Sequence, residues 1–183
     1  MGSNPTPRTI ILPASRSPIL SFGGYVMSSA TMVEGTIVVI DIDRFEEKTR
    51  MLGLDPYRPN RFTALLTNLV EELAVSWRAI VVYGLDRERG TEEAVIEIPL
   101  TKPEEVEDDL VRVAREMCEA RAPVTIVAIE GLVGPGKPVD RRLAYSGSPD
   151  RARARRILEK LKRRGGGAVY VNGRIVWKCR GSE

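Results

Sequence analysis

The sequence predicts an α+β domain of the ferredoxin-like type, with an antiparallel sheet and helices on one face. An extra helix and a terminal β-hairpin follow it. Three observations support this fold class: a β-branched strand comes first, a hairpin lies between two amphipathic helices, and a second hairpin ends the chain. The order β-α-β-β-α-β is that of the split β-α-β unit. A doubly wound parallel sheet, the alternative for alternating elements, does not accommodate the central hairpin.

The length of 183 residues is that of one domain. Residues 1–33 are rich in Pro, Ser, Gly and Thr and lack any strand or helix period, so we expect a flexible extension there. An upstream start codon that is not used, or a strand added to a partner, are the alternatives. We expect residues 34–178 to form the single domain and residues 179–183 a short tail.

The first half of the domain shows its elements by periodicity. Residues 36–42 are a β-branched run typical of a strand buried on both faces. A polar loop follows, and apolar residues at helical spacing then predict an amphipathic helix over 60–77. Residues 79–83 and 94–100 flank a charged, Gly-containing turn and predict a hairpin.

The second half continues with clear boundary signals. A helix is predicted over 102–119, because its acidic first turn suits the positive end of the helix dipole. Residues 123–129 form a strand, and 131–149 a Gly- and Pro-rich loop with a short turn near 141–143. A Ser-Pro-Asp cap opens a helix that ends at residue 164. Residues 168–177 form a hairpin around an Asn-Gly turn.

Histidine is absent from the whole chain. This excludes Ser-His-Asp and Cys-His catalytic units and most catalytic zinc sites, because these need an imidazole. Any chemistry must therefore use carboxylates, Lys, Arg, hydroxyl groups, backbone dipoles or a hard metal ion. The net charge of +3 is only slight support for a nucleic-acid partner.

The cysteine count and the apolar runs indicate a cytoplasmic protein. Cys118 and Cys179 are too few and too far apart for a disulfide scaffold, so two free thiols in a reducing interior are predicted. No apolar run reaches the roughly 18 residues of a membrane span. Of the 28 Lys and Arg residues 22 are Arg, and Gln is absent, which fits a thermophile or a GC-rich genome.

Two carboxylates lie at the carboxyl end of the first strand. Asp41 and Asp43 are two residues apart on an extended chain, so their side chains are expected on the same side. Such a pair repels unless a cation lies between, and Mg²⁺ takes oxygen ligands and bridges to substrate phosphates. The pair predicts an Mg²⁺ or Mn²⁺ site. Ion pairs with the many Arg residues are the alternative.

The turn of the central hairpin carries further carboxylates. In a split β-α-β sheet the central hairpin strand lies beside the first strand, so a carboxylate at the start of its turn would approach Asp41. Asp86 is the first candidate, and Glu92 or Glu93 the next. A salt-bridged surface hairpin is the alternative for each of them.

The helix over 151–164 has eight basic residues and one acidic residue. A helix this basic favours an anionic partner, either a triphosphate or an RNA backbone. Aromatic residues for stacking single-stranded RNA are missing nearby, so RNA is the less favoured partner. The loop over 131–137 resembles a phosphate-binding loop only superficially, and we expect a flexible flap in which Lys137 is a candidate phosphate contact.

Several of these segments together resemble nucleotide-cyclase-like palm domains. Residues 39–45 (Val-Ile-Asp-Ile-Asp-Arg-Phe) resemble the metal-binding first strand of GGDEF-type diguanylate cyclases. Residues 160–166 (Lys-Leu-Lys-Arg-Arg-Gly-Gly) resemble their last helix, where a Lys contacts the nucleotide phosphates. Residues 59–61 (Pro-Asn-Arg) and 124–126 (Val-Thr-Ile) look similar to archaeal GTP cyclohydrolase III, which has two palms in tandem. The Gly-Gly-Asp/Glu-Glu-Phe signature itself is absent.

The resemblance implies an Mg²⁺- or Mn²⁺-dependent enzyme that converts a nucleoside triphosphate, with GTP first, by cyclohydrolase or cyclase chemistry. Asp41, Asp43 and Asp86 would be catalytic, and the same carboxylates together with the Ile42 carbonyl would hold the metal. The residues implied to bind the nucleotide or its phosphates are Arg44, Phe45, Asn60, Arg61, Lys162 and Arg163.

The number of palms has a further implication. Relatives use paired palms and this chain has one, so a homodimer with twofold symmetry is implied. Two hypotheses of other classes stay open: a non-catalytic nucleotide-sensing or protein-interaction module on the same fold, and an RNA-binding ferredoxin-like domain.

Overall fold

The computed structural model describes residues 32–55, 58–134 and 140–180. Of the extension predicted over 1–33, residues 1–31 lie outside the described residues, and Val33 already belongs to the first strand. The predicted flap residue Lys137 also lies outside them. Within these ranges the strands are β1 (Val33–Ile42), β2 (Ile80–Tyr83), β3 (Glu93–Pro99), β4 (Val124–Val133), β5 (Ala168–Val171) and β6 (Arg174–Lys178). The helices are α1 (Phe45–Met51), α2 (Arg61–Ser76), α3 (Glu107–Glu119), α4 (Arg141–Ser146) and α5 (Pro149–Arg163).

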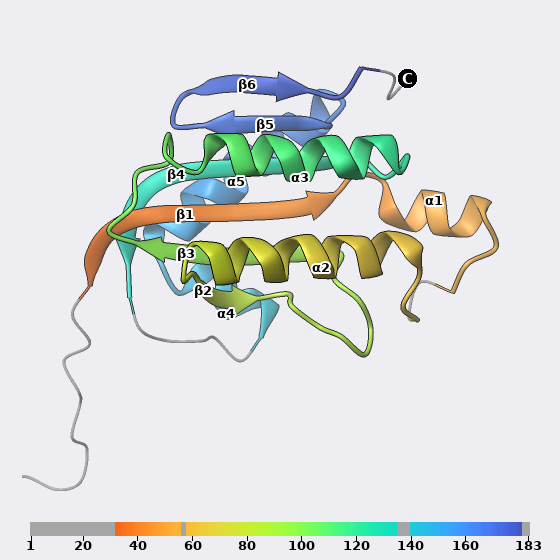
Figure 1. Cartoon of the computed structure of the whole chain (residues 1–183), viewed down its shortest axis with the longest axis horizontal. Helices are drawn as coiled ribbons and strands as arrows, with labels where there is room; N and C mark the ends of the chain where they lie inside the picture. Colours follow the sequence, from red (N-terminus) through yellow and green to blue (C-terminus); the bar gives the residue numbers. More distant parts are fainter. Residues whose placement is uncertain (1–31, 56–57, 135–139, 181–183) are drawn as a thin grey trace, which may run out of the picture.

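All six strands form one sheet in the order β2-β3-β1-β4-β5-β6 (Figure 1). β1 pairs antiparallel with both β3 and β4, which is the arrangement expected of the split β-α-β unit. β5 joins β4 in parallel after the connection through α5, and β6 closes the terminal hairpin. The predicted ferredoxin-like α+β fold is therefore confirmed.

The residues of β1 alternate between two apolar layers. Val38, Ile40 and Ile42 pack with α2 and α3, whereas Ile37 and Val39 pack with α4 and α5. Figure 1 shows α2 and α3 on the near side of the sheet and α5 behind it. The two helices of the core unit share one face as predicted, and the extra helix covers the other. By the same alternation, Asp41 faces the α4–α5 side.

Capping residues explain where the long helices begin. The Asn60 side chain accepts hydrogen bonds from the N–H groups of Phe62 and Thr63, and Ser148 accepts one from the N–H of Arg151. Both caps satisfy amide groups that the first helical turn leaves without a partner.

Two helix predictions need correction. The segment after Ile42 contains the short helix α1 instead of a continuous loop. The sequence did not indicate this helix, because seven residues are too few to show an apolar period. The helix predicted from residue 102 begins only at Glu107, and the residues immediately before it form a turn.

The prediction of two free thiols is wrong. Cys118 at the end of α3 forms a disulfide with Cys179, which directly follows β6, and their Cα atoms lie 6.0 Å apart. The two positions are 61 residues apart in sequence, and only the fold brings them together. The two cysteines therefore lend no support to a reducing compartment. Among the described helices, none has the length and apolar composition needed to cross a bilayer.

Candidate functional site

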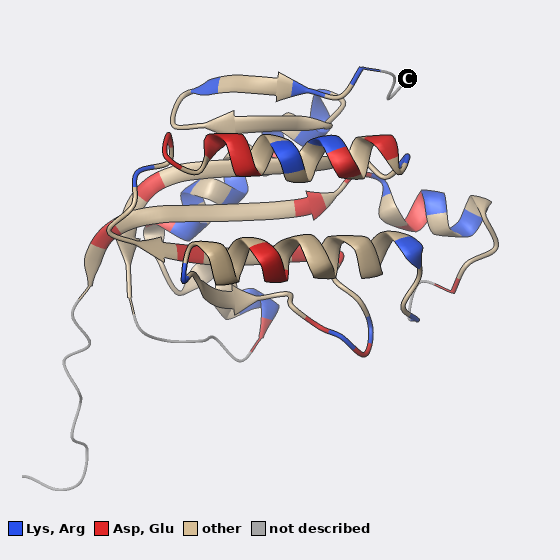
Figure 2. Ribbon diagram, viewed as in Figure 1, with Lys and Arg blue, Asp and Glu red and all other residues tan. Residues whose placement is uncertain are grey.

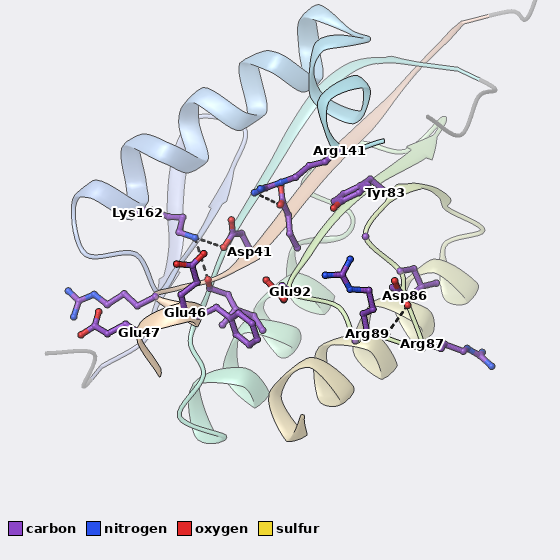
Figure 3. Close-up of a pocket in the computed structure, with 17 residues that line it drawn as sticks. Asp41, Glu46, Glu47, Tyr83, Asp86, Arg87, Arg89, Glu92, Arg141 and Lys162 are labelled. Carbon is purple, nitrogen blue, oxygen red and sulfur yellow. Dashed lines mark hydrogen bonds and ion pairs between the residues drawn. The ribbon is translucent and has the colours of Figure 1, made fainter. Parts of the chain in front are cut away.

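A cleft of about 930 Å³ opens at the carboxyl end of β1. Its walls come from α1, the β2–β3 turn, α4 and the last turn of α5 (Figure 3). β1 carries no charge along its middle and an acidic residue near its carboxyl end (Figure 2). The charged side chains that line the cleft are Asp41, Arg44, Glu46, Glu47, Asp86, Arg87, Arg89, Glu92, Glu93, Arg141 and Lys162. Its size is that of a small-ligand site, and its lining is unusually polar for one.

Asp41 lies at the centre of this cleft, paired with Lys162. The ammonium of Lys162 donates a hydrogen bond to Asp41 Oδ1 and lies 3.3 Å from the carbonyl oxygen of Ile42. Burial raises the pKa of Asp41, and the ammonium of Lys162 opposes that rise. Lys162 lies in the last turn of α5, where a cation is also favoured by the helix dipole. The structure thus brings together Asp41 and Lys162, two of the residues named from the sequence, whereas Asp43 does not line this cleft.

Asp43 has a separate set of partners. Its carboxylate accepts hydrogen bonds from Thr125 Oγ1 at 2.8 Å and from the Gly167 N–H at 2.7 Å. Gly166 is tightly constrained beside it, since a Cβ there would lie 2.5 Å from Asp43 Oδ1. Burial raises the pKa of Asp43, while the Gly167 N–H and the Thr125 hydroxyl lower it. Asp43 therefore holds the α5–β5 connection against the end of β1.

Glu93 is the carboxylate directly opposite Asp41 in the β1–β3 ladder. Its Oε1 accepts a hydrogen bond from the Tyr145 hydroxyl, and its Oε2 lies 2.5 Å from Arg141 Nη2. Burial and the nearby charge of Glu93 strongly raise the pKa of Tyr145. Arg155 covers the ring of Tyr145, with its guanidinium carbon 4.7 Å from the ring centroid.

The contribution of α4 to the cleft was missed in the sequence. Arg141 and Tyr145 belong to a segment that the sequence predicted as a loop with a short turn. Their spacing of four residues, which places two side chains on one helix face, is the signal that could have indicated them.

Asp86 lines the same cleft, but its carboxylate folds back onto its own turn. Its Oδ1 accepts hydrogen bonds from the N–H groups of Glu88 and Arg89 at 2.8 and 2.9 Å. The strand beside β1 is β3, which follows the turn, so the carboxylate that meets Asp41 is Glu93. Figure 3 shows Asp86 on the opposite side of the cleft from Lys162.

The remaining predicted nucleotide contacts divide into two groups. Arg44 and Phe45 line the cleft at the start of α1. Asn60 and Arg61 do not line it: Asn60 caps α2, and Arg61 lies over the Phe62 ring at 4.6 Å. Arg163 is exposed on α5 and is likewise not part of the lining.

The donors at the end of β1 suit one hard cation. Asp41 Oδ1 and the Ile42 carbonyl oxygen both contact one ammonium, so this position attracts positive charge. Mg²⁺ is usually held by one or two carboxylates, with phosphates and water completing its shell. The described residues contain no group of three or more Cys, Asp or Glu that could hold a metal ion. Asp41 and the Ile42 carbonyl are thus donors for at most one ion, and the described residues form no preformed two-ion centre.

Part of the charge of α5 is used in contacts within the protein, whereas Arg153, Arg156, Lys160, Arg163 and Arg164 are exposed. Arg151 pairs with the buried Glu97 at 3.6 Å, and Lys162 pairs with Asp41. Arg155 is engaged along the helix, 2.9 Å from Glu159. These contacts leave fewer cations for an RNA backbone than the sequence alone suggests.

Comparisons with known proteins show likeness of fold only. No family model matches the chain, and no curated protein matches its sequence. One similar solved structure is that of a bacterial light-regulated adenylyl cyclase, with a TM-score of 0.47 and 14% identity over 76% of this chain and 43% of that one. A second structure of a bacterial light-regulated adenylyl cyclase has a TM-score of 0.46 and 14% identity, covering 75% and 41%. The chain spans less than half the length of either, and likeness at this level does not define a function.

The element order, the sheet order and the site place the protein in a structural class. It is a ferredoxin-like α+β domain with a charged cleft at the carboxyl end of its central strand.

Proposed function

We propose that the cleft binds a nucleoside triphosphate, GTP in the first instance, together with one Mg²⁺ or Mn²⁺ ion. The observation that carries this proposal is the position of the Lys162 ammonium against Asp41 and the Ile42 carbonyl. Carboxylate and carbonyl oxygens beside a Lys are the groups that a polyphosphate and its counter-ion require.

The other cations of the cleft would complete the phosphate site. Arg44 and Arg141 both line the cleft, and their planar guanidinium groups suit the paired oxygens of a phosphate. Tyr83 also lines the cleft and would offer the base an aromatic surface, whereas Phe45 is buried in the apolar core beneath it. The cleft volume of about 930 Å³ is ample for a nucleotide.

Conversion of the nucleotide is the enzymatic form of the proposal. A bound ion would lower the pKa of the attacking group, which is water in cyclohydrolase chemistry and a ribose hydroxyl in cyclase chemistry. Asp41 would then hold the ion, and Lys162 would neutralise charge on the phosphates. A homodimer belongs to the same proposal, and light scattering with and without GTP tests it.

A nucleotide-sensing module without turnover is the second candidate. It is supported by Asp43, whose carboxylate is already occupied by Thr125 and Gly167, and by Glu93, which is held by Arg141 and Tyr145. A catalytic carboxylate needs freedom to bind an ion or move a proton, and these two have little in the structure.

Calorimetry of the full chain tests the binding proposal. GTP, ATP, CTP and UTP are titrated in the presence of Mg²⁺ or Mn²⁺, and products are followed by chromatography. We expect Lys162→Met to weaken nucleotide binding at least tenfold, whereas Lys160→Met, an exposed Lys on the same helix, serves as the matched control. Equal affinity in the two variants would contradict the proposal. Binding without product would favour the sensing module.

A further inference from the structure

Two carboxylates that face each other across β1 and β3 are each covered by a cation from the α4–α5 layer. We propose that Lys162 and Arg141 are internal counter-ions of Asp41 and Glu93. When phosphates enter the cleft, the two cations move from the carboxylates to the phosphate oxygens, and the carboxylates can then bind the divalent ion. Phosphate and metal would then bind cooperatively, and the metal alone would bind poorly. This inference rests on the proposed function and describes how the same site is regulated.

The first step is the closeness of the carboxylates. Asp41 and Glu93 are register partners in an antiparallel ladder. The Cβ atoms of directly opposed residues lie roughly 5 Å apart, and like charges placed so are destabilising. Asp43 and Glu92 add further negative charge around Asp41. The end of β1 therefore requires positive charge when no ligand is present.

The second step is the source of that charge. Lys162 contacts Asp41 Oδ1 and lies 3.3 Å from the Ile42 carbonyl oxygen, the two atoms that would hold the ion. Arg141 lies 2.5 Å from Glu93 Oε2, and the other oxygen accepts the hydrogen bond of Tyr145. Both cations thus occupy the positions in which a divalent ion would neutralise the same carboxylates.

The third step is the order of exposure. The side chains of Lys162 and Arg141 are 29% and 59% exposed, whereas those of Asp41 and Glu93 are 18% and 10% exposed. Within each of these two pairs the cation is the more exposed partner, so an incoming phosphate reaches the cation before it reaches the carboxylate. Figure 3 shows Lys162 pointing toward Asp41, and Arg141 extending toward the same part of the cleft.

The consequence is a coupling between the two ligands. Movement of the cations onto phosphate oxygens leaves Asp41 and Glu93 without a cationic partner, and the divalent ion restores neutrality. Such coupling is reciprocal, because each ligand raises the affinity of the other by the same factor. We expect that factor to be about tenfold to a hundredfold, the usual range of coupling between sites.

The test measures Mn²⁺ binding by electron paramagnetic resonance, with Mn²⁺ alone and with inorganic tripolyphosphate. The association of Mn²⁺ with tripolyphosphate, measured without protein, is subtracted. In the wild type we expect weak Mn²⁺ binding that tightens at least tenfold when tripolyphosphate is added. Lys162→Met should bind Mn²⁺ alone at least tenfold more tightly than the wild type, and bind tripolyphosphate more weakly. Lys160→Met should behave as the wild type.

A second variant protects the test against misfolding. Arg141→Met removes the cationic partner of Glu93, as Lys162→Met removes that of Asp41, and should also gain Mn²⁺ binding. Circular dichroism verifies the fold of both variants. Wild-type protein that binds Mn²⁺ equally with and without tripolyphosphate would overturn the inference. So would folded variants without a gain in Mn²⁺ affinity, even if GTP binds. A gain in Mn²⁺ affinity without any GTP binding would instead retain the counter-ion role and reject the proposed nucleotide.

Discussion

The two helical layers are attached to the sheet by different kinds of interaction. α2 and α3 cover one face through a continuous apolar core, and the Cys118–Cys179 disulfide ties the end of α3 to the chain after β6. α4 and α5 cover the other face through a smaller apolar core and through ion pairs of Arg141, Arg151 and Lys162 with strand carboxylates.

The difference bears on where a charged ligand could bind. Apolar contacts and a disulfide do not exchange with solvent ligands, so the α2–α3 layer is the structural support. Ion pairs at a cleft can exchange partners with a charged ligand, so the α4–α5 layer is where binding is expected. The following predictions test this division, from the largest expected effect to the smallest.

Removal of the disulfide should give the largest loss of stability. We expect Cys118→Ser with Cys179→Ser to lower the free energy of unfolding by about 4 kcal/mol, because a cross-link over a separation of 61 residues restricts the unfolded chain. Denaturant unfolding under non-oxidising conditions measures the loss, and wild-type protein with a reductant should lose the same amount. Nucleotide binding should not change. A variant as stable as the wild type would show that the cross-link does not form.

Arg151→Met tests an ion pair on the α4–α5 face that lies away from the cleft lining. The Arg151 and Glu97 side chains are only 10% and 3% exposed, and burial raises the pKa of Glu97. Removing one partner leaves an uncompensated buried carboxylate and should cost about 3 kcal/mol. Adding Glu97→Gln to this variant should recover part of the loss in denaturant unfolding. A double variant less stable than the single variant would mean that the pair itself is not the cause.

The pH dependence of stability should reflect the carboxylates of the cleft. Burial raises the pKa of Asp41 and Glu92 above their ordinary values. The folded state then holds these protons more tightly than the unfolded chain, so their contribution to stability increases as pH falls from neutral through the raised pKa. It is complete below the ordinary value, which is 3.8 for Asp41. Thermal melting from pH 7 to 4.5 should show a smaller pH dependence in Asp41→Asn than in the wild type. Parallel profiles would contradict the assignment.

Arg174→Met should have the smallest effect. Arg174 on β6 lies 2.6 Å from Glu107 on α3, and its side chain is 61% exposed. Exposed ion pairs contribute at most about 1 kcal/mol, so this contact should add little beside the disulfide on the same layer. Denaturant unfolding of the variant measures it. A loss as large as that of the cysteine variant would mean that charge, and not the cross-link, holds β6 against α3.

Local sequence patterns were sufficient for most of the fold. The β-branched run before Asp41 predicted the central strand, and the Asn-Gly turn predicted the terminal hairpin. These signals lie within a few neighbouring residues. A buried strand or helix face needs the same apolar spacing whichever element it packs against, so the spacing can be recognised without the fold. Helix α1 was missed because a single short helix shows no period.

The candidate site was predicted only in part. Asp41, Lys162, Arg44, Phe45 and Asp86 do line one cleft. Asn60 and Arg61 do not, since their side chains serve the start of α2. The importance of Glu93 depends on which hairpin strand pairs with β1, and that choice is not visible in the hairpin's own residues.

By itself, the sequence determined the order of the strands and of the three long helices, the strand that ends in carboxylates and the basic helix near the end of the chain. It did so because composition and periodicity act over short distances. Only the tertiary structure decided which charges meet. Lys162 and Asp41 are 121 residues apart, and Cys118 and Cys179 are 61 apart. Their pairing depends on strand order and on which face of the sheet a helix covers, and these are set by the packing of the whole chain.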